Sequence, residues 1–176
     1  MSLARACGGS AITRACRVPP VAIVYYDPAR PLEAQPGFRA GQAGIVDFTL
    51  DDPAQARLAR VAIPPNACHA LVGLGVVSRL NLLPLEVGPI AHGREAVLFP
   101  SALERAIEIL YAFENELWSG ERDFGSVELV VERRAGDPVV EYRLRFDRRE
   151  FERSLLRLID LFHAAWRAGR GVRLAL

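Results

Sequence analysis

Two segments of alternating apolar and charged residues, between about residues 126 and 146, constrain the fold more than any other part of this sequence. In both segments every second residue is apolar, as in a strand with one buried face. They are separated by Ala135, Gly136, Asp137 and Pro138, a composition typical of turns. The pattern predicts an antiparallel hairpin over about residues 126–146.

The same alternation predicts the register of the hairpin. Pairing centred on the turn places Glu128 opposite Arg145 on one face and gathers the apolar residues on the other. The predicted apolar pairs are Val127 with Phe146, Leu129 with Leu144, and Val131 with Tyr142. A shift of one residue would turn this apolar set to solvent, so the pattern favours this register.

A helix is predicted before the hairpin, over about residues 101–118. Ser101 and Glu104 have the spacing of a capping box, and Gly120 offers a C-terminal stop. Between them apolar residues recur at steps of three and four, which is the helical period. These residues are Leu103, Ala106, Ile107, Leu110, Phe113, Leu117 and Trp118.

A second helix is predicted after the hairpin, over about residues 148–168. Asp147 and Glu150 form its capping pair, and Gly169 ends it. Because a two-stranded hairpin is marginal in water, its apolar face must be covered by the flanking helices or by the first half of the chain. Our interpretation is that the two helices and the hairpin form one apolar sandwich.

The first half of the chain is less regular. Residues 21–26, 45–50 and 95–99 have compositions typical of strands. Because the strands come in runs and do not alternate with helices, we expect an α+β fold with an antiparallel sheet and a C-terminal helix-hairpin-helix unit. A chain of this length fits one domain, which we place at residues 19–176 after a flexible N-terminal segment at residues 1–18.

The charge balance restricts the class of partner. The chain has 22 basic and 21 acidic residues, and all the basic residues are arginines. Such a balance argues against an overall field that would attract nucleic acid or an anionic membrane. An arginine-only composition is typical of a G+C-rich genome, and we expect a bacterial protein.

The cysteines and the apolar segments bear on the compartment. Three cysteines, an odd number without metal-like spacing, favour reduced thiols in the cytoplasm. The first 26 residues lack the continuous apolar stretch of a signal peptide. The nearest candidate for a membrane helix, residues 61–78, is interrupted by prolines. We therefore expect a cytoplasmic protein, while the arginine-rich and acid-poor start also fits an organellar transit peptide.

Glu114 is the sharpest anomaly in the sequence. It falls on the apolar side of the first predicted helix, close to the C-terminal end, where the helix dipole disfavours a negative charge. A carboxylate there is either desolvated or paired with a cation, and Arg79, Arg94 and Arg122 are the candidate partners. Glu114 could therefore belong to a structural ion pair or to a binding pocket.

The middle segment, residues 61–93, carries only two formal charges, Arg79 and Glu86. Such a segment is either the buried core of the domain or an apolar face that a partner covers. Its polar groups Asn66, His69 and Arg79 are those that a pocket would use to orient a ligand. These three residues and Glu114 are therefore our candidate binding residues.

No catalytic or metal-binding motif stands out. Cys68 and His69 are adjacent, so on a helix or a strand their side chains point apart and cannot form an activated nucleophile. The cysteines and histidines lack metal-ligand spacing, and no phosphate-binding loop is present. We expect no catalytic residue, no metal and no cofactor.

Arginines also gather on one face of the second predicted helix. Arg149, Arg153 and Arg157 follow one another at four-residue steps and form a possible basic surface for phosphates. Asp160 falls on the same face, and few aromatic residues accompany the arginines. This composition favours a solvated, partly self-paired surface over a nucleic-acid interface.

Two hypotheses about function remain. The favoured one is a non-catalytic cytoplasmic protein-binding module, such as an accessory protein, an inhibitor or an assembly factor, whose partner is another protein or a second copy in a homo-oligomer. The alternative is a small enzyme or small-molecule-binding protein with a pocket near Glu114 and His69, in which Glu114 acts as acid or base. Binding of nucleic acid through the last helix is a more distant third hypothesis.

Overall fold

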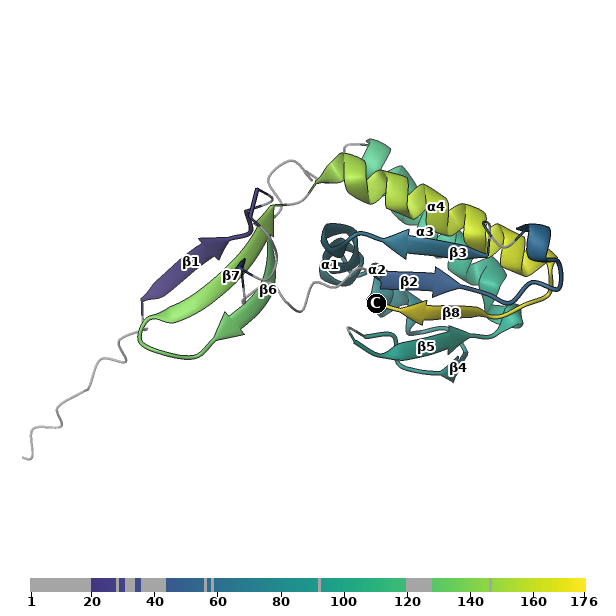
Figure 1. The fold of residues 1–176 in the computed structure, drawn as a ribbon, viewed down its shortest axis with the longest axis horizontal. Helices are drawn as coiled ribbons and strands as arrows, with labels where there is room; N and C mark the ends of the chain where they lie inside the picture. The colour runs from purple at the N-terminus through teal and green to yellow at the C-terminus, as the bar shows by residue number, and fades with distance from the viewer. Residues whose placement is uncertain are drawn as a thin grey trace, which may run out of the picture.

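A computed structural model describes residues 20–27, 29–30, 34–35, 44–55, 57, 59–91, 93–119, 128–145 and 147–176. The described residues form two β-sheets and four α-helices, so the predicted α+β class is confirmed (Figure 1). The predicted flexible segment, residues 1–18, lies outside the described residues.

The larger sheet has five strands in the order β3-β2-β8-β5-β4, and every neighbouring pair is antiparallel. Its strands are β2 (Gly44–Asp47), β3 (Arg60–Ile63), β4 (Leu85–Val87), β5 (Glu95–Leu98) and β8 (Val172–Ala175). The last of them in the sequence, β8, is central, because Val46 of β2 and Ala96 of β5 both pair with Leu174.

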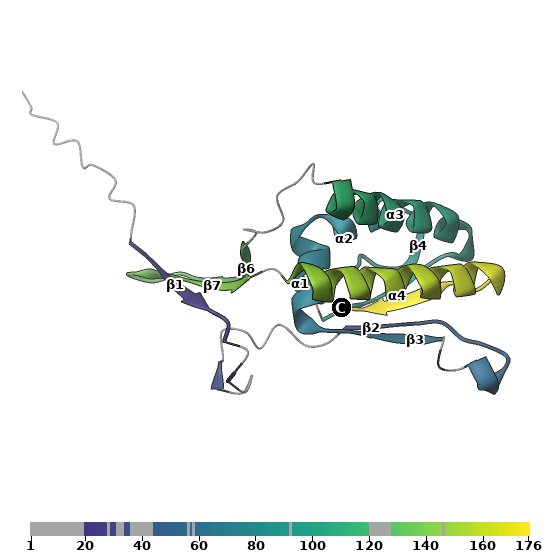
Figure 2. The same ribbon diagram turned by 90° about the horizontal axis from the view of Figure 1, so that it is seen from above.

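Two long helices, α3 (Leu103–Ser119) and α4 (Arg148–Arg167), lie side by side against one face of this sheet (Figure 2). The helix α4 begins as predicted, because the Asp147 carboxylate accepts a hydrogen bond from the Glu150 backbone N–H. The predicted cap at Ser101 was wrong. Residues Pro100–Ala102 form a 3-10 turn without a side-chain cap, and α3 begins at Leu103.

The core lies between these helices and the sheet. Phe113 of α3 and Phe151 and Phe162 of α4 are almost fully buried there. Alternate residues of the central strands, such as Leu98 and Leu174, are buried with them, as expected for a sheet with one covered face. Two short helices, α1 (Pro65–Gly73) and α2 (Val76–Leu80), complete this unit, which we call the body.

The smaller sheet has three strands in the order β1-β7-β6. Its strands are β1 (Val21–Tyr25), β6 (Glu128–Arg134) and β7 (Val139–Arg145). The strands β6 and β7 form the predicted hairpin, and β1 is added to it parallel to β7. This sheet, which we call the arm, extends to one side of the body beyond α1 (Figures 1 and 2).

The register of the hairpin follows the alternation only in part. Glu128 pairs with Arg145 and Leu129 with Leu144, as predicted. Beyond Val130 the register shifts, so that Glu132, and not the predicted Val131, lies opposite Tyr142. A bulge of this kind adds one residue to one strand, which a sequence period of two does not reveal. The predicted pair of Val127 and Phe146 lies outside the described residues.

The interpretation of helices and hairpin as one sandwich was wrong. The helices α3 and α4 pack against each other and the five-stranded sheet, which offers a wider apolar face than two strands can. The first half of the chain contacts the hairpin at its base, where Leu129 lies close against Gly73 at the end of α1. Leu129 and Leu144 are consequently buried at the base of the arm.

Candidate functional site

A cleft lies where the arm meets the body. It consists of two contiguous hollows of about 740 and 450 Å³, which share Tyr26, Asn66, Asp147 and Arg149 as lining residues. We call it the basic cleft. Among the described residues, its lining is Tyr25, Tyr26, Pro65, Asn66, Arg145, Asp147, Arg148, Arg149, Glu150 and Arg153.

Four elements bring these residues together. The end of β1 supplies Tyr25, and the backbone N–H of Tyr26 donates to the Arg143 carbonyl at 2.9 Å, which holds this segment along β7. The first turn of α1 supplies Pro65 and Asn66, and the end of β7 supplies Arg145. The N-cap Asp147 and the first two turns of α4 supply the remaining residues, among which Arg149 and Arg153 are four positions apart and share a face of the helix.

The lining has an excess of positive charge, with four arginines against Asp147 and Glu150. The Asp147 carboxylate is already engaged as the cap of α4. Arg149 and Arg153 are exposed and make no ion pair or hydrogen bond with any residue that the structure describes. The cleft therefore holds two guanidinium groups whose donors have no protein acceptor in the described part of the chain.

The other two arginines of the cleft have protein partners. The Arg148 guanidinium donates to the Leu117 carbonyl and lies 5.7 Å from the ring centre of Trp118. The Arg145 guanidinium lies 5.0 Å from the ring centre of Tyr25. Both side chains therefore line the cleft while held by contacts with other residues.

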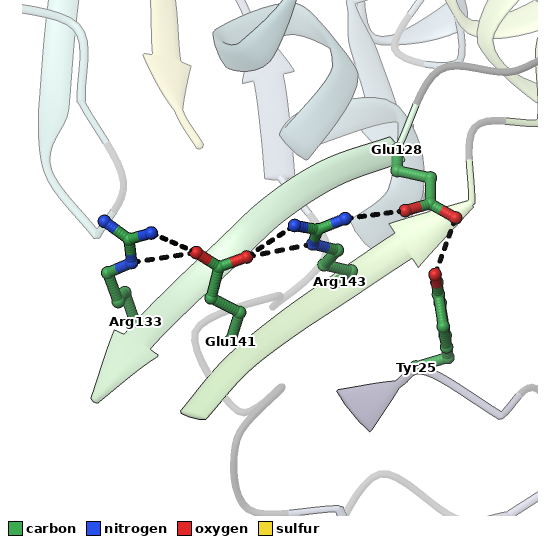
Figure 3. A network of polar contacts seen from close by, with 5 residues as sticks. All are labelled: Tyr25, Glu128, Arg133, Glu141 and Arg143. Atoms are coloured by element: carbon green, nitrogen blue, oxygen red, sulfur yellow. Dashed lines mark hydrogen bonds and ion pairs between the residues drawn. The ribbon is translucent and has the colours of Figure 1, made fainter. Parts of the chain in front are cut away.

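A continuous polar network crosses one face of the arm (Figure 3). Glu141 accepts hydrogen bonds from Arg143 and Arg133, with Nε to carboxylate distances of 3.0 and 2.9 Å. The Glu141 side chain is only 5 % exposed, and each of its two carboxylate oxygens is paired with a guanidinium group. Arg143 also donates to Glu128 at 2.9 Å, and the Tyr25 hydroxyl donates to the other Glu128 oxygen at 2.8 Å.

This network sets the protonation of its members. Hydrogen bonds from Arg143 and then Arg133 lower the pKa of Glu141, and those from Tyr25 and Arg143 lower the pKa of Glu128. The hydrogen bond to Glu128 raises the pKa of Tyr25. Both carboxylates therefore stay charged at neutral pH and link all three strands of the arm.

The outer edge of β1 is unpaired by any described strand. The Pro20 carbonyl and the Tyr26 N–H form hydrogen bonds with β7. Backbone groups of successive residues point to opposite sides of a strand, so the N–H and C=O groups of Val21, Ile23 and Tyr25 point away from β7. The strand contains no charged residue, and the side chains of Val21, Ile23 and Val24 are 45 %, 43 % and 41 % exposed.

The structure places the predicted site residues in different parts of the body. Glu114 is half-buried on α3, and His69 is buried within α1, and neither lines the basic cleft. Arg79, a predicted partner of Glu114, instead pairs with Glu116 at 3.2 Å and stacks 4.4 Å from the ring centre of Phe113. Arg122, another predicted partner, lies outside the described residues.

Three predicted residues do come together, because Asn66, Arg149 and Arg153 all line the basic cleft. Arg157 lies further along α4, in a separate hollow of about 330 Å³ that also contains Asp160. Tyr25, Tyr26 and Arg148 were not among the predicted site residues. The two tyrosines reach the cleft through the pairing of β1 with β7, which joins distant segments and leaves no local signal.

Cys68 is fully buried, with its Sγ 3.6 Å from the Ile63 carbonyl oxygen. Burial raises the pKa of its thiol to about 11, so the thiol stays protonated at neutral pH and is a poor nucleophile. Among the described residues, no three His, Cys, Asp or Glu side chains are grouped as a metal site would require. None of the described helices has the length and apolar character needed to cross a membrane.

Comparisons with known proteins give no relative to set beside this site. No family model matches this chain, and neither a curated protein nor a solved structure matches it.

Proposed function

We propose that the protein is a non-catalytic protein-binding module whose binding element is the outer edge of β1. The strand that pairs with this edge is β1 of a second copy, so that two arms join into one continuous sheet. The observation that carries this proposal is that an apolar, uncharged edge strand with exposed side chains has its outer backbone donors and acceptors unpaired among the described strands.

The other described sheet edges carry the features that normally prevent pairing. The opposite edge of the arm, β6, has a bulge and the charged residues Glu132, Arg133 and Arg134. The edges of the body, β3 and β4, have four and three residues, and β4 pairs irregularly with β5. Bulges, charges and short strands all oppose the addition of another strand. β1 has none of these protections along its five residues.

A second copy fits the β1 edge because the edge is self-complementary. In an antiparallel pair about a two-fold axis at Ile23, Val21 of one copy lies opposite Tyr25 of the other. Every side chain brought into a cross-strand pair is then apolar or aromatic, and no like charges meet. Each copy supplies to its partner the uncharged strand that the partner's edge requires.

The test is the mass of the protein in solution, measured by sedimentation velocity and by light scattering after size exclusion. The protein is studied at about 100 μM, because an interface built on one short strand is small and therefore weak. We expect a species of twice the 19.4 kDa chain mass. A monomer at this concentration would contradict the proposal.

Ile23→Pro is the decisive variant. The Ile23 N–H points away from β7, so proline removes a donor from the outer edge without removing one from the β1–β7 ladder. We expect this variant to be monomeric with an intact arm. Ile23→Lys should also be monomeric, whereas the matched control Val130→Lys, which adds the same charge to the same face at the β6 edge, should remain a dimer. A dimer that survives Ile23→Pro would place the interface elsewhere.

A further inference from the structure

The basic cleft has a separate role from the β1 edge. We propose that it binds a small ligand through a phosphate or diphosphate group, which Arg149 and Arg153 hold. The proposal does not rest on self-association, because all the described residues that line the cleft belong to one copy.

The spacing of the two arginines suits such a group. Arg149 and Arg153 are four residues apart on α4, which corresponds to about 6 Å along the helix axis. Guanidinium groups on one side of a helix at this spacing can each donate two hydrogen bonds to neighbouring phosphate oxygens. Neither arginine has an acid partner among the described residues, so a ligand need not break an existing ion pair to bind.

The rest of the lining favours a compact anion of high charge. Asp147 and Glu150 offset two of the four arginine charges, so the described lining keeps an excess of two positive charges. The Asn66 amide, from the first turn of α1, adds a neutral donor. A phosphate or diphosphate carries enough acceptor oxygens to engage several of these donors at once.

The shape of the cleft favours a small molecule over a nucleic-acid strand. Its larger hollow, about 740 Å³, lies in the size range of small-molecule sites. The arginine row does not continue as an unbroken basic track, because Arg157 lies in a different hollow together with Asp160. A strand that followed α4 would therefore meet an acidic group after Arg157.

The test is direct titration with pyrophosphate, ATP, adenosine and citrate at constant ionic strength. Trp118 serves as the reporter, because it contacts Arg148 of the cleft, and Trp166→Phe removes the second tryptophan. We expect saturable binding of pyrophosphate and ATP and no binding of adenosine. If pyrophosphate and ATP bind with equal affinity, the phosphate groups alone are recognised. If ATP binds more tightly, its nucleoside also contributes. Both results support the proposal.

Arg149→Gln with Arg153→Gln should weaken pyrophosphate binding by about tenfold or more, as expected when charge-assisted hydrogen bonds are lost. The matched control is Arg157→Gln with Arg167→Gln, which removes the same charge from the same helix outside the cleft and should leave the affinity unchanged. If the double variant does not fold, Arg153→Gln alone gives the same test with a smaller loss.

Three results would overturn the proposal. One is an equal loss of affinity in both double variants, which would indicate unspecific attraction. Another is binding of citrate as tight as that of pyrophosphate, since citrate offers carboxylates of similar charge. The third is binding of a single-stranded oligonucleotide that depends on Arg157 and Arg167, which would assign the surface of α4 to nucleic acid.

Discussion

The body and the arm are both sheets, yet different forces stabilise them. The body buries one face of five strands under helices, around large side chains such as Phe113 and Phe162. Among the apolar side chains of the arm whose burial the structure describes, Leu129 and Leu144 at its base are the buried ones, and a ladder of arginines and glutamates links its strands further out. The difference teaches that apolar residues in this chain serve two purposes, because those facing the core of the body are buried whereas Val21, Ile23 and Val24 of β1 stay exposed at the edge of a sheet.

This difference implies unequal local stability. Exposed ion pairs contribute little free energy each, and three strands without a covered face are marginal in water. Burial of a large side chain contributes several times more. We therefore expect the arm to open locally while the body stays folded, and binding surfaces are commonly found in such parts of a protein.

The largest expected effect is on the free energy of unfolding, when a buried and an exposed aromatic residue of the same helix are replaced. Phe162 of α4 is fully buried, and Phe162→Ala should lower the free energy of unfolding by about 3–5 kcal/mol through lost burial and a cavity. The control is Trp166→Ala on the same helix, where the side chain is exposed and the loss should be about 0.5 kcal/mol or less. Urea denaturation of both variants measures the contrast. Equal losses would mean that α4 does not cover the sheet as described.

A smaller and more local effect is expected at the junction of arm and body. Leu129→Ala removes the side chain that packs against Gly73 of α1, so the arm should lose its attachment while the body keeps its core. Amide hydrogen exchange should accelerate in β6 and β7 by a factor of about ten or more and stay unchanged in β2 and β8. Val130→Ala, at the exposed neighbouring position, should change neither region. Faster exchange throughout the body would show that the two sheets unfold as one unit.

The smallest effect concerns acid pH. The pKa values of Glu128 and Glu141 are lowered in the folded arm, so their contribution to stability is present above the ordinary glutamate pKa and is lost as the pH falls through the folded values. In the body, the hydrogen bond from Arg173 lowers the pKa of Asp47 in the same direction, but a large core remains when Asp47 is protonated.

As the pH falls below about 4.3, the ordinary glutamate pKa, the arm should therefore loosen before the body does. NMR spectra of the backbone amides, recorded along this titration, distinguish the two regions. Glu128→Gln with Glu141→Gln should loosen the arm already at neutral pH and remove most of its acid response. If the amide signals of arm and body in the unmodified protein disappear at the same pH, the ladder of arginines and glutamates does not determine the stability of the arm.

The sequence was informative where structure depends on neighbouring residues. The alternation around residues 126–146 predicts the hairpin, and the capping pair of Asp147 and Glu150 predicts the start of α4. The parallel pairing of β1 with β7 was not predictable, because no local period reports which distant strand lies beside Val21–Tyr25. The packing of α3 and α4 on the five-stranded sheet was not predictable for the same reason. That sheet exists only once strands from distant parts of the chain have paired.

The candidate site shows the same limit. Asn66, Arg149 and Arg153 stood out individually for their chemistry, but the cleft that unites them exists only once the arm is joined to the body. Glu114 stood out because of its place on a helical wheel, and it is half-buried without lining the cleft. A wheel orders the residues around one helix, whereas the side chains that meet across elements depend on the tertiary arrangement.

The central place of β8 also has a kinetic consequence. Its pairing joins Val46 and Leu174, which are far apart along the chain, so the sheet closes only after a large loop entropy has been overcome. Proteins dominated by such distant pairings reach the native state in milliseconds to seconds, whereas helices form in microseconds or less. We therefore expect α3 and α4 to gain structure early in refolding, and the slow step to be the insertion of β8 between its two neighbours.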